Sequence, residues 1–508
     1  MNSRQSMGGS VREGLGNGYL TVFLTLILTV MLSFSLTLIV SAGENTRRFV
    51  AECVTDIGMN SILAEYHREL LEQYNVFFTD ISYGTQVVAY ENMTEHLKNY
   101  INHNLQGDDL FMQGVYGNLI HMELENIAIN GALSACEEGG ISLRRQAVDA
   151  VKQDVGITYL EKTGDWLATI QNSGIMDINL LEKQKETEEK VVELTGKKMG
   201  TLFEKEEQED SAVTFYEAGI LNLVADREEL SSREITLSQY ASHRVHFESG
   251  GLSVPEGYAD DFWDELFFHE YLMSYTGHYG KAKENSGLTD DKNSGVTYGK
   301  NSGVAYDKNF GLAYETEYLL AGKAKDIDNL KAAAGQILAI RGGANLIALM
   351  QDEGKKQYAQ ILAFSMASAL GMPEAAEVLE ELLEIIWAMA EALYDVSALL
   401  QGGRIPVIKQ PEEWHYSMEN ALNFVKPEAE QTEITDGLSY EDYLRILLCF
   451  HGKEELTMRM ADVMEMNIRN TPGNENFCMD GCFEAFRVQI VYRGERDKTY
   501  TIDRTYGY

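Results

Sequence analysis

The stretch GYLTVFLTLILTVMLSFSLTLIVSAG, residues 18–43, contains no charged side chain and decides how the chain is organised. A helix of about 20 apolar residues crosses a hydrocarbon core of ~30 Å, and this stretch is long enough. Two alternatives stay open: a buried core helix, or a cleaved secretory signal, whose apolar core usually has only about 7–15 residues. The uninterrupted length favours a transmembrane helix over residues 19–42, with membrane lipid as its partner.

Hydroxyl residues recur within this stretch, and their side chains can bond to carbonyls of the preceding helical turn, which makes them tolerable in lipid. Apolar residues then continue at helical spacing from Phe49 to Tyr74, with charged residues between them. Only Gly58 interrupts this pattern. We therefore expect one helix from about Tyr19 to Tyr74, half in lipid and half against protein.

The residues before the apolar stretch predict its orientation. Residues 1–18 carry Arg4 and Arg12 against Glu13, and short basic flanks remain in the cytoplasm. This tail or leader is too short to form a domain, so the folded mass follows the helix. We expect a single-pass protein of the cell membrane, with a cytoplasmic N-terminus and the bulk of the chain extracytoplasmic.

The composition limits the partners of the folded part. The 508 residues include 79 Asp and Glu against 42 Lys and Arg, a net charge of −37. Such an excess of negative charge repels phosphate backbones, so we expect no nucleic-acid partner. Only 6 prolines and a hydrophobic content of 44% fit a packed, largely helical protein.

Residues 43–280 are predicted to be helix-rich with some strand. We expect a helix over residues 86–105, a half-buried strand over 119–129, and a helix capped by Ser142. Residues 177–208 are highly charged and predict a solvated helical arm.

Residues 281–314 form a repeat insert. The octapeptides KNSGVTYG, KNSGVAYD and KNFGLAYE follow one another from residue 292 to 315. Asn-Ser-Gly favours turns and Val-x-Tyr favours strands, so the insert is either a flexible product of duplication or a small stack of hairpins.

Residues 315–508 are predicted to form an α+β domain. Helices are expected over 327–350, 358–370 and 374–400, with Pro373 in the first turn of the last. Two more follow, one capped near Ser439. The final residues, AFRVQIVYRGERDKTYTIDRTYGY, alternate on both sides of a turn, as in a β-hairpin. The predicted fold class is α+β, helix-dominated, with a long N-terminal transmembrane helix extended into an extracytoplasmic domain and a C-terminal β-hairpin.

Motifs that carry catalysis are missing from the sequence. It has no phosphate-binding loop, no nucleophile elbow and no HExxH, since Met273 stands where a second ligand after His269 would be. Arg341-Gly342-Gly343 is too short for a dinucleotide loop and more simply bends or ends a helix. The acidic and aromatic residues around Phe262 and Leu266 fit an amphipathic helix that buries these two side chains. We therefore predict no catalytic residue, no cofactor and no metal.

The five cysteines give one local pattern. Cys478 and Cys482 lie in NFCMDGCF, where they are either buried free thiols or a local disulfide. Zinc is not expected there, because the sequence around them contains no second pair and no histidine at ligand spacing. Cys449, within LRILLCF, is expected to be a buried thiol.

The N-terminal segments resemble a known family. GYLTVFLTLILTVMLSFSLTLIVSAGENTRRF and NSILAEYHRELLEQYNVFF are similar to the N-terminal regions of TadE/TadG-like proteins of tight-adherence pilus systems, closest to a branch of large membrane-anchored proteins in clostridia-type bacteria. YETEYLLAG, EEWHYSM and LSYEDYLRILLCF also resemble that branch. The resemblance implies an anchored minor pilin or assembly component, with Gly16 and Gly18 as candidate leader-processing sites.

One departure from the pilin pattern changes this expectation. Pilin-type proteins usually carry a glutamate near the start of the apolar segment, whereas Tyr19 to Val40 contains no acid. An accessory protein of a pilus or surface structure therefore fits better than a main filament subunit. The alternatives are an anchored extracellular enzyme that uses Asp or Glu, or a ligand-binding or adhesin domain.

Overall fold

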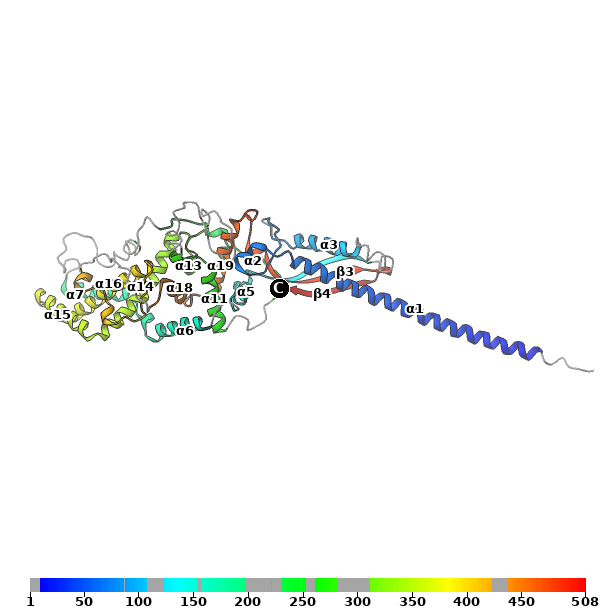
Figure 1. Cartoon of the computed structure of the whole chain (residues 1–508), viewed down its shortest axis with the longest axis horizontal. Helices are drawn as coiled ribbons and strands as arrows, with labels where there is room; N and C mark the ends of the chain where they lie inside the picture. The colour runs from blue at the N-terminus through cyan, green and yellow to red at the C-terminus, as the bar shows by residue number, and fades with distance from the viewer. Residues whose placement is uncertain are drawn as a thin grey trace, which may run out of the picture.

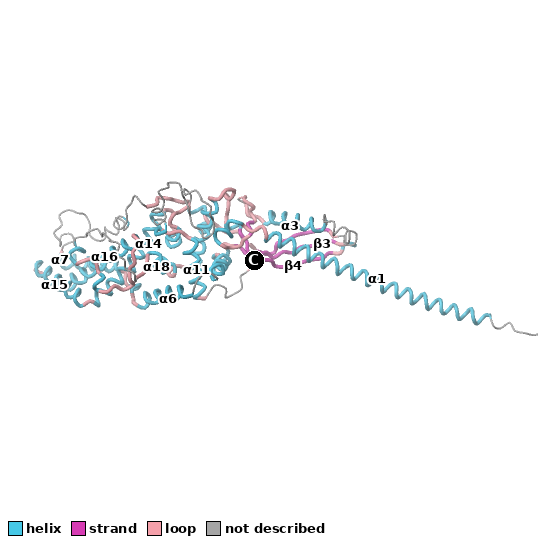
Figure 2. Tube along the Cα trace, in the orientation of Figure 1, coloured by secondary structure: helices cyan, strands magenta, loops and turns pink. Residues whose placement is uncertain are grey.

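The computed structural model describes residues 10–85, 87–106, 122–152, 157–196, 221, 230–247, 249–252, 261–281, 311–422 and 437–508. Within these residues the molecule is elongated, and one long helix projects from the end of the folded part (Figure 1). Helices dominate, and a small antiparallel sheet lies where the long helix joins the rest (Figure 2). The predicted helix-dominated α+β class is confirmed.

The long helix, α1 (Ser10–Leu63), ends earlier than predicted. A separate helix, α2 (Arg68–Tyr74), follows after a turn. The prediction of one helix to Tyr74 was wrong because a tertiary contact stops it: the His67 N–H donates to the Phe78 carbonyl at 2.8 Å, and Tyr66 bridges Thr79. A helical periodicity alone cannot reveal such a contact.

The sheet has four strands, β1 (Thr79–Asp80), β2 (Glu123–Ser134), β3 (Cys482–Arg493) and β4 (Thr499–Gly507). β3 is central: β2 pairs with one edge, and β4 and β1 pair with the other, all antiparallel. The predicted C-terminal hairpin is therefore β3 and β4. The predicted strand near residues 119–129 is β2, which extends further toward the C-terminus.

Helices α1 and α3 (Tyr90–Gln106) cover this sheet. A core of α1 and sheet side chains, including Ala51, Met59 and Ile62, lies between them. Gly58 permits the close approach of α3, since a Cβ there would lie 3.0 Å from a methyl carbon of Leu97. The residue that interrupts the helical pattern is thus the point where two helices touch.

The remaining helices build a larger helical body. They are α5 (Ile141–Lys152), α6 (Ile157–Asn172), α7 (Leu180–Thr195), α11 (Phe262–Tyr275), α13 (Glu315–Ala321), α14 (Asp326–Gln351), α15 (Glu353–Leu370), α16 (Ala376–Leu400), α17 (Met418–Leu422), α18 (Tyr440–Leu448) and α19 (Lys453–Arg469). Short 3-10 turns connect several of them: η1 (Glu137–Gly139), η2 (Ile175–Asp177), η4 (Leu237–Gln239), η5 (Ala241–His243), η6 (Pro373–Ala375), η7 (Pro411–Glu413), η8 (Met479–Gly481) and η9 (Glu495–Asp497).

The C-terminal helices follow the sequence signals closely. α14, α15 and α16 match the three predicted helices, and Pro373 opens the turn that leads into α16. The Ser439 hydroxyl accepts a hydrogen bond from the Asp442 N–H, and the Asp442 carboxylate accepts one in return from the Ser439 N–H. This capping box begins α18 as predicted.

Three local predictions were wrong. α7 is not a solvated arm, because its Leu180 and Val191 are buried and the helix packs against α16. Ser142 does not cap α5; it lies inside the first turn and its hydroxyl donates to Glu484. Phe262 is 50% exposed, although Leu266 is buried as expected. For α7 and Ser142 the partner comes from a distant part of the chain.

The Arg341-Gly342-Gly343 motif does not end a helix. It lies in the middle of α14, where all three residues are buried. A Cβ on Gly343 would lie 2.8 Å from the Ile175 carbonyl oxygen, and one on Gly342 would lie 2.7 Å from a methyl carbon of Leu180. The two glycines therefore let η2 and the start of α7 approach α14.

Most of the predicted octapeptide insert lies outside the described residues. The end of its last copy is described: Leu312 and Tyr314 are buried and lead into α13. The parts of the chain on either side of the insert share their cores, since β2 pairs with β3 and α5 packs against α19.

Candidate functional site

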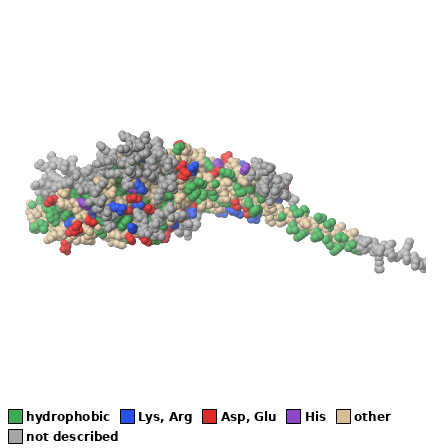
Figure 3. Space-filling view, viewed as in Figure 1, with side chains coloured by type: hydrophobic (Ala, Val, Ile, Leu, Met, Phe, Trp, Pro, Cys, Tyr) green, Lys and Arg blue, Asp and Glu red, His purple; other side chains and the backbone are tan. Residues whose placement is uncertain are grey.

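The first half of α1 is an apolar surface without any protein covering it. Every large apolar side chain from Tyr19 to Val40 is exposed. Figure 3 shows these side chains around the projecting helix, whereas acidic and basic side chains gather on the folded part. Soluble proteins rarely expose apolar patches above a few hundred Å². A helix that is apolar on all sides suits lipid or a protein core.

Four hydroxyl groups in this segment form hydrogen bonds within the helix. Thr29 Oγ1 donates to the Thr25 carbonyl at 2.6 Å, and Thr37 Oγ1 donates to the Ser33 carbonyl at 2.8 Å. Thr25 and Ser33 bond to the preceding turn in the same way. The predicted back-bonding is confirmed for these four hydroxyls, which need neither water nor a neighbouring helix as partner.

Two described helices are long and apolar enough to cross a membrane, by length and composition. They differ in burial: the apolar window in Tyr19–Leu63 is 0% buried, whereas 67% of the window in Asp326–Gln351 is buried. α14 is therefore a core helix of the folded part. The exposed half of α1 has about 22 residues and a length of about 33 Å, close to the thickness of a hydrocarbon core.

The second half of α1 is attached to the β3–β4 hairpin by a row of polar contacts. We call this the helix–hairpin contact; it joins Glu44, Arg47, Glu52 and Asp56 of α1 to Lys498, Glu495, Arg504 and Tyr506 of the hairpin. Arg47 lies 2.8 Å from Glu495, and Arg504 lies 3.0 Å from Asp56. Beneath this row, Thr55 and Tyr492 share a buried hydrogen bond of 2.7 Å. The contact begins directly after the exposed apolar segment.

A second group of chemically reactive side chains lies at the start of β3. We call it the thiol–histidine cluster; it consists of Cys136, His246, Cys478 and Asp480, held by Arg244 and Glu465. Asp480 Oδ1 bonds to His246 Nδ1 at 2.7 Å, and Asp480 Oδ2 accepts from Cys478 Sγ at 3.2 Å. Arg244 bridges Asp480 and Glu465.

Hydrogen bonds, burial and ion pairs determine the charges of the side chains in the cluster. The hydrogen bond to Asp480 raises the pKa of His246, so this imidazole is more readily protonated than a free one. Burial raises the pKa of the Cys478 thiol to about 12, and burial also raises that of Cys136. Both sulfurs are therefore thiols at neutral pH. Arg244 and Arg469 balance the two carboxylates, Glu465 and Asp480.

The structure does not join Cys478 to Cys482, and both are free cysteines. The two sulfurs take different directions across η8: Cys478 Sγ lies against Arg244 at 2.9 Å, whereas Cys482 Sγ lies 3.9 Å from the Cys478 carbonyl. Of the two interpretations of this pattern, free thiols or a local disulfide, the structure contains the free thiols. Cys449, expected to be buried, is half-buried beside His269.

Gly16 and Gly18, the candidate processing sites, both lie within α1. They precede the exposed apolar segment, as a leader junction would. Processing at either position stays a prediction.

A buried ionic network lies between α14, α16 and the segment before η7. Arg341 Nε lies 2.9 Å from Asp395 Oδ2, and Lys409 contacts both Asp395 and Glu391, with all four side chains 0% exposed. Paired charges of this kind stay buried because each has a partner. The network is closed from solvent, so it acts as a structural element.

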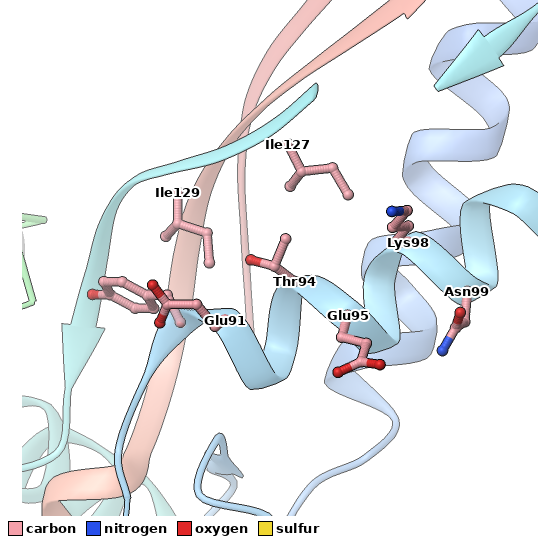
Figure 4. A pocket seen from close by; sticks show the side chains of 8 residues that line it. Glu91, Thr94, Glu95, Lys98, Asn99, Ile127 and Ile129 are labelled. Carbon is pink, nitrogen blue, oxygen red and sulfur yellow. The ribbon is translucent and has the colours of Figure 1, made fainter. Parts of the chain in front are cut away.

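One open pocket of about 580 Å³ lies between α3 and β2 (Figure 4). Its lining includes Glu91, Glu95 and Lys98 from one face of α3, with Ile127 and Ile129 from β2. The lining residues include no histidine, cysteine or serine. Its two carboxylates, Glu91 and Glu95, are of the residue type that the enzyme alternative would use, so that alternative stays a prediction.

Sequence reasoning missed most members of the thiol–histidine cluster. His246 and Cys136 stand alone in the sequence, and nothing local connects them with Asp480. Only the NFCMDGCF motif marked one side of the cluster. The pairing of β2 with β3 brings Cys136 to this motif, and the Ala135 N–H donates to the Cys482 carbonyl at 2.9 Å.

Comparison with known proteins gives one match. Residues 203–494, more than half of the chain, match the model of a family of unknown function, DUF5702. This region covers most of the helical body and β3, but neither α1 nor β4. No curated protein and no solved structure matches the chain. The chain belongs to the DUF5702 family, whose function is unknown.

Proposed function

We propose that this protein is a single-pass membrane protein whose acidic folded part lies outside the cell, where it serves a structural or assembly role without catalysis. One observation carries the proposal: α1 is a single helix that exposes only uncharged, mostly apolar side chains from Tyr19 to Val40 and whose second half is built into the sheet. Burying the exposed half in lipid removes its apolar surface from water. The proposed cytoplasmic N-terminus rests on Arg4 and Arg12, which precede the apolar segment from Tyr19 to Val40.

The manner of attachment supports a mechanical role. A flexible linker would let the folded part move freely, whereas here the membrane segment and the sheet share one helix. The helix–hairpin contact and the buried bond between Thr55 and Tyr492 fix the orientation of that helix. A folded part held in this way keeps a defined height and direction above a membrane, which suits the positioning of a partner.

The partner that we propose is a surface structure of the tight-adherence pilus type. The support is the resemblance of the N-terminal segments to TadE/TadG-like proteins. Since Tyr19 to Val40 contains no acid, we assign an accessory place in assembly and not that of a main filament subunit. Two acidic groups buried in the body, Glu391 and Asp395, are engaged in ion pairs with Lys409.

Anchoring and orientation are tested together by protease treatment of intact cells or protoplasts that produce the full chain. We expect the folded part to be digested, leaving a membrane-embedded fragment that contains residues 19–42. A variant with Leu28→Arg and Leu32→Arg is the control and should leave no such fragment. Protection of the whole chain until the membrane is permeabilised would contradict the proposed orientation.

The assembly role needs a separate experiment. Deleting the gene should reduce the number of surface appendages, and a copy with an intact anchor should restore them. N-terminal sequencing of the protein from native cells adds the processing state: a start near Tyr19 would indicate pilin-type processing. Appendages that are unchanged in number and form after deletion would contradict the assembly role while leaving the anchor intact.

A further inference from the structure

Three distant segments meet at the thiol–histidine cluster. Cys136 follows β2, His246 follows η5, and Cys478 and Asp480 lie just before the start of β3. The donor atoms of Cys136, His246 and Asp480 all lie within 4.8 Å of one another. Those of Glu465, Cys478 and Asp480 do the same, so Asp480 belongs to both groups.

The donor set is of the kind that zinc prefers. Zinc in proteins binds thiolate sulfur, imidazole nitrogen and carboxylate oxygen, usually four in a tetrahedron. With bonds of about 2.0–2.3 Å, the ligand atoms of such a site lie about 3.3–3.8 Å apart. Cys478 Sγ already lies 3.2 Å from Asp480 Oδ2, and His246 Nδ1 lies 2.7 Å from Asp480 Oδ1. Within the group of Cys136, His246 and Asp480, no spacing exceeds 4.8 Å, so these three need to contract by about 1 Å at most. Cys478 joins them through its contact with Asp480.

We propose that Cys136, His246, Cys478 and Asp480 form a binding site for a divalent cation of the zinc class. Arg244 and Glu465 lie around the ligands: Arg244 bonds to Asp480, Glu465 and Cys478, and Glu465 also accepts from the Met479 N–H at 2.8 Å. Such surrounding groups orient metal ligands and fix their geometry.

The charges of the cluster are compatible with a bound divalent cation. Glu465 and Asp480 are already balanced by Arg244 and Arg469. When a divalent cation binds, the two thiols lose their protons to water and bind as thiolates, so their two negative charges offset the two positive charges of the cation. His246 binds as a neutral imidazole, so a proton on Nδ1 also leaves to water.

A cation can reach the site from solvent, and its binding would connect three segments of the chain. His246 and Cys478 are half-buried, whereas Cys136 and Asp480 are buried, so a cation can enter from the side of the first two. Its ligands would connect the end of β2, the segment after η5 and the start of β3. The cation would thereby fasten the segment after η5 to the strands of the sheet that carries α1.

The test uses the full chain in detergent, reduced and treated with a chelator, and then titrated with Zn²⁺ or with Co²⁺ as a spectroscopic probe. We expect one cation per chain, a thiolate-to-cobalt absorption band, and a higher melting temperature with zinc. Cys136→Ser and His246→Ala should each weaken binding at least about tenfold. Cys449→Ser is the matched control, because Cys449 also lies beside a histidine, at 3.4 Å from His269 Nδ1.

Two results would overturn the proposal. One is unchanged zinc stoichiometry and affinity in Cys136→Ser and His246→Ala, after circular dichroism has shown that both variants are folded. The half-exposed position of His246 makes that variant the safer of the two for folding. The other is a protein from native cells in which mass spectrometry finds Cys136 or Cys478 in a disulfide, since the cluster would then serve redox chemistry.

Discussion

The two halves of α1 belong to one unbroken helix and have opposite surroundings. Between Tyr19 and Val40 the helix contains only apolar, hydroxyl and aromatic side chains, and all of them are exposed. From Ala51 to Leu63 it alternates buried apolar residues with charged ones that bond to the hairpin. The first half is uniform around its circumference, whereas the second is amphipathic, and this difference separates a lipid-facing helix from one that packs on a sheet. Each half should therefore respond to a different kind of substitution.

The largest effect is expected for charges placed in the middle of the exposed half. Leu28→Arg combined with Leu32→Arg should weaken membrane insertion by about 5–7 kcal/mol, since each arginine at a helix centre costs about 2.5–3.5 kcal/mol. The fraction of protein that remains in membranes after a carbonate wash measures this. Asn60→Arg, an exposed position in the folded half, should leave the fraction unchanged. Retention of the double variant would mean that the exposed half does not lie in lipid.

A smaller effect, on folding, is expected from the buried half. Ile62 is 0% exposed and packs under the sheet, so Ile62→Ala should lower the free energy of unfolding by about 2–5 kcal/mol. The same change at Ile39, which is 69% exposed, should leave the folded part as stable as before. Thermal unfolding of both variants in detergent tests the contrast. Equal losses would show that the two halves do not differ in packing.

The difference between the two halves of α1 could be predicted from the sequence because the signals for each half are local. A run without charge, the Ser439 cap and the alternation around the C-terminal turn each act within a few residues. The end of α1 was missed because the backbone of Tyr66 and His67, just beyond it, pairs with Phe78 and Thr79, and helical periodicity gives no sign of that pairing. Likewise, Cys136 and Cys478 come together through strand pairing across most of the chain, so spacing rules for metal ligands could not find them.

Membrane retention through the exposed half of α1 and the stability of the folded part should also differ in their response to pH. The exposed half has no acidic or basic residue, so membrane retention should not change between about pH 4.5 and pH 7. In the body, burial raises the pKa of Glu317 to about 7 from an ordinary value of 4.5. Its Oε1 accepts from the Tyr279 N–H and the Tyr440 hydroxyl, while Oε2 is buried with no hydrogen-bond partner among the described residues.

The sign follows from proton binding. Between these two pKa values the folded state keeps the Glu317 proton and the unfolded chain loses it. The free energy of unfolding should therefore fall as pH rises from about 4.5 to about 7, by up to about 3 kcal/mol. Glu317→Gln should remove this part of the slope, as measured by denaturant unfolding at several pH values. Glu189→Gln, at an exposed position, should not.

The smallest effect is expected at the helix–hairpin contact. Arg504 pairs with Glu52 and Asp56, but its side chain is 42% exposed, so Arg504→Ala should cost less than about 1 kcal/mol and the loss should disappear at high salt. Thr55→Val, which removes the buried bond to Tyr492, should cost more, because the hydroxyl of Tyr492 is then left without its partner. Denaturant unfolding at low and high salt distinguishes the two. If the loss in Arg504→Ala were the larger and persisted in salt, surface charge would be what orients the folded part on its anchor, and the buried bond would be secondary.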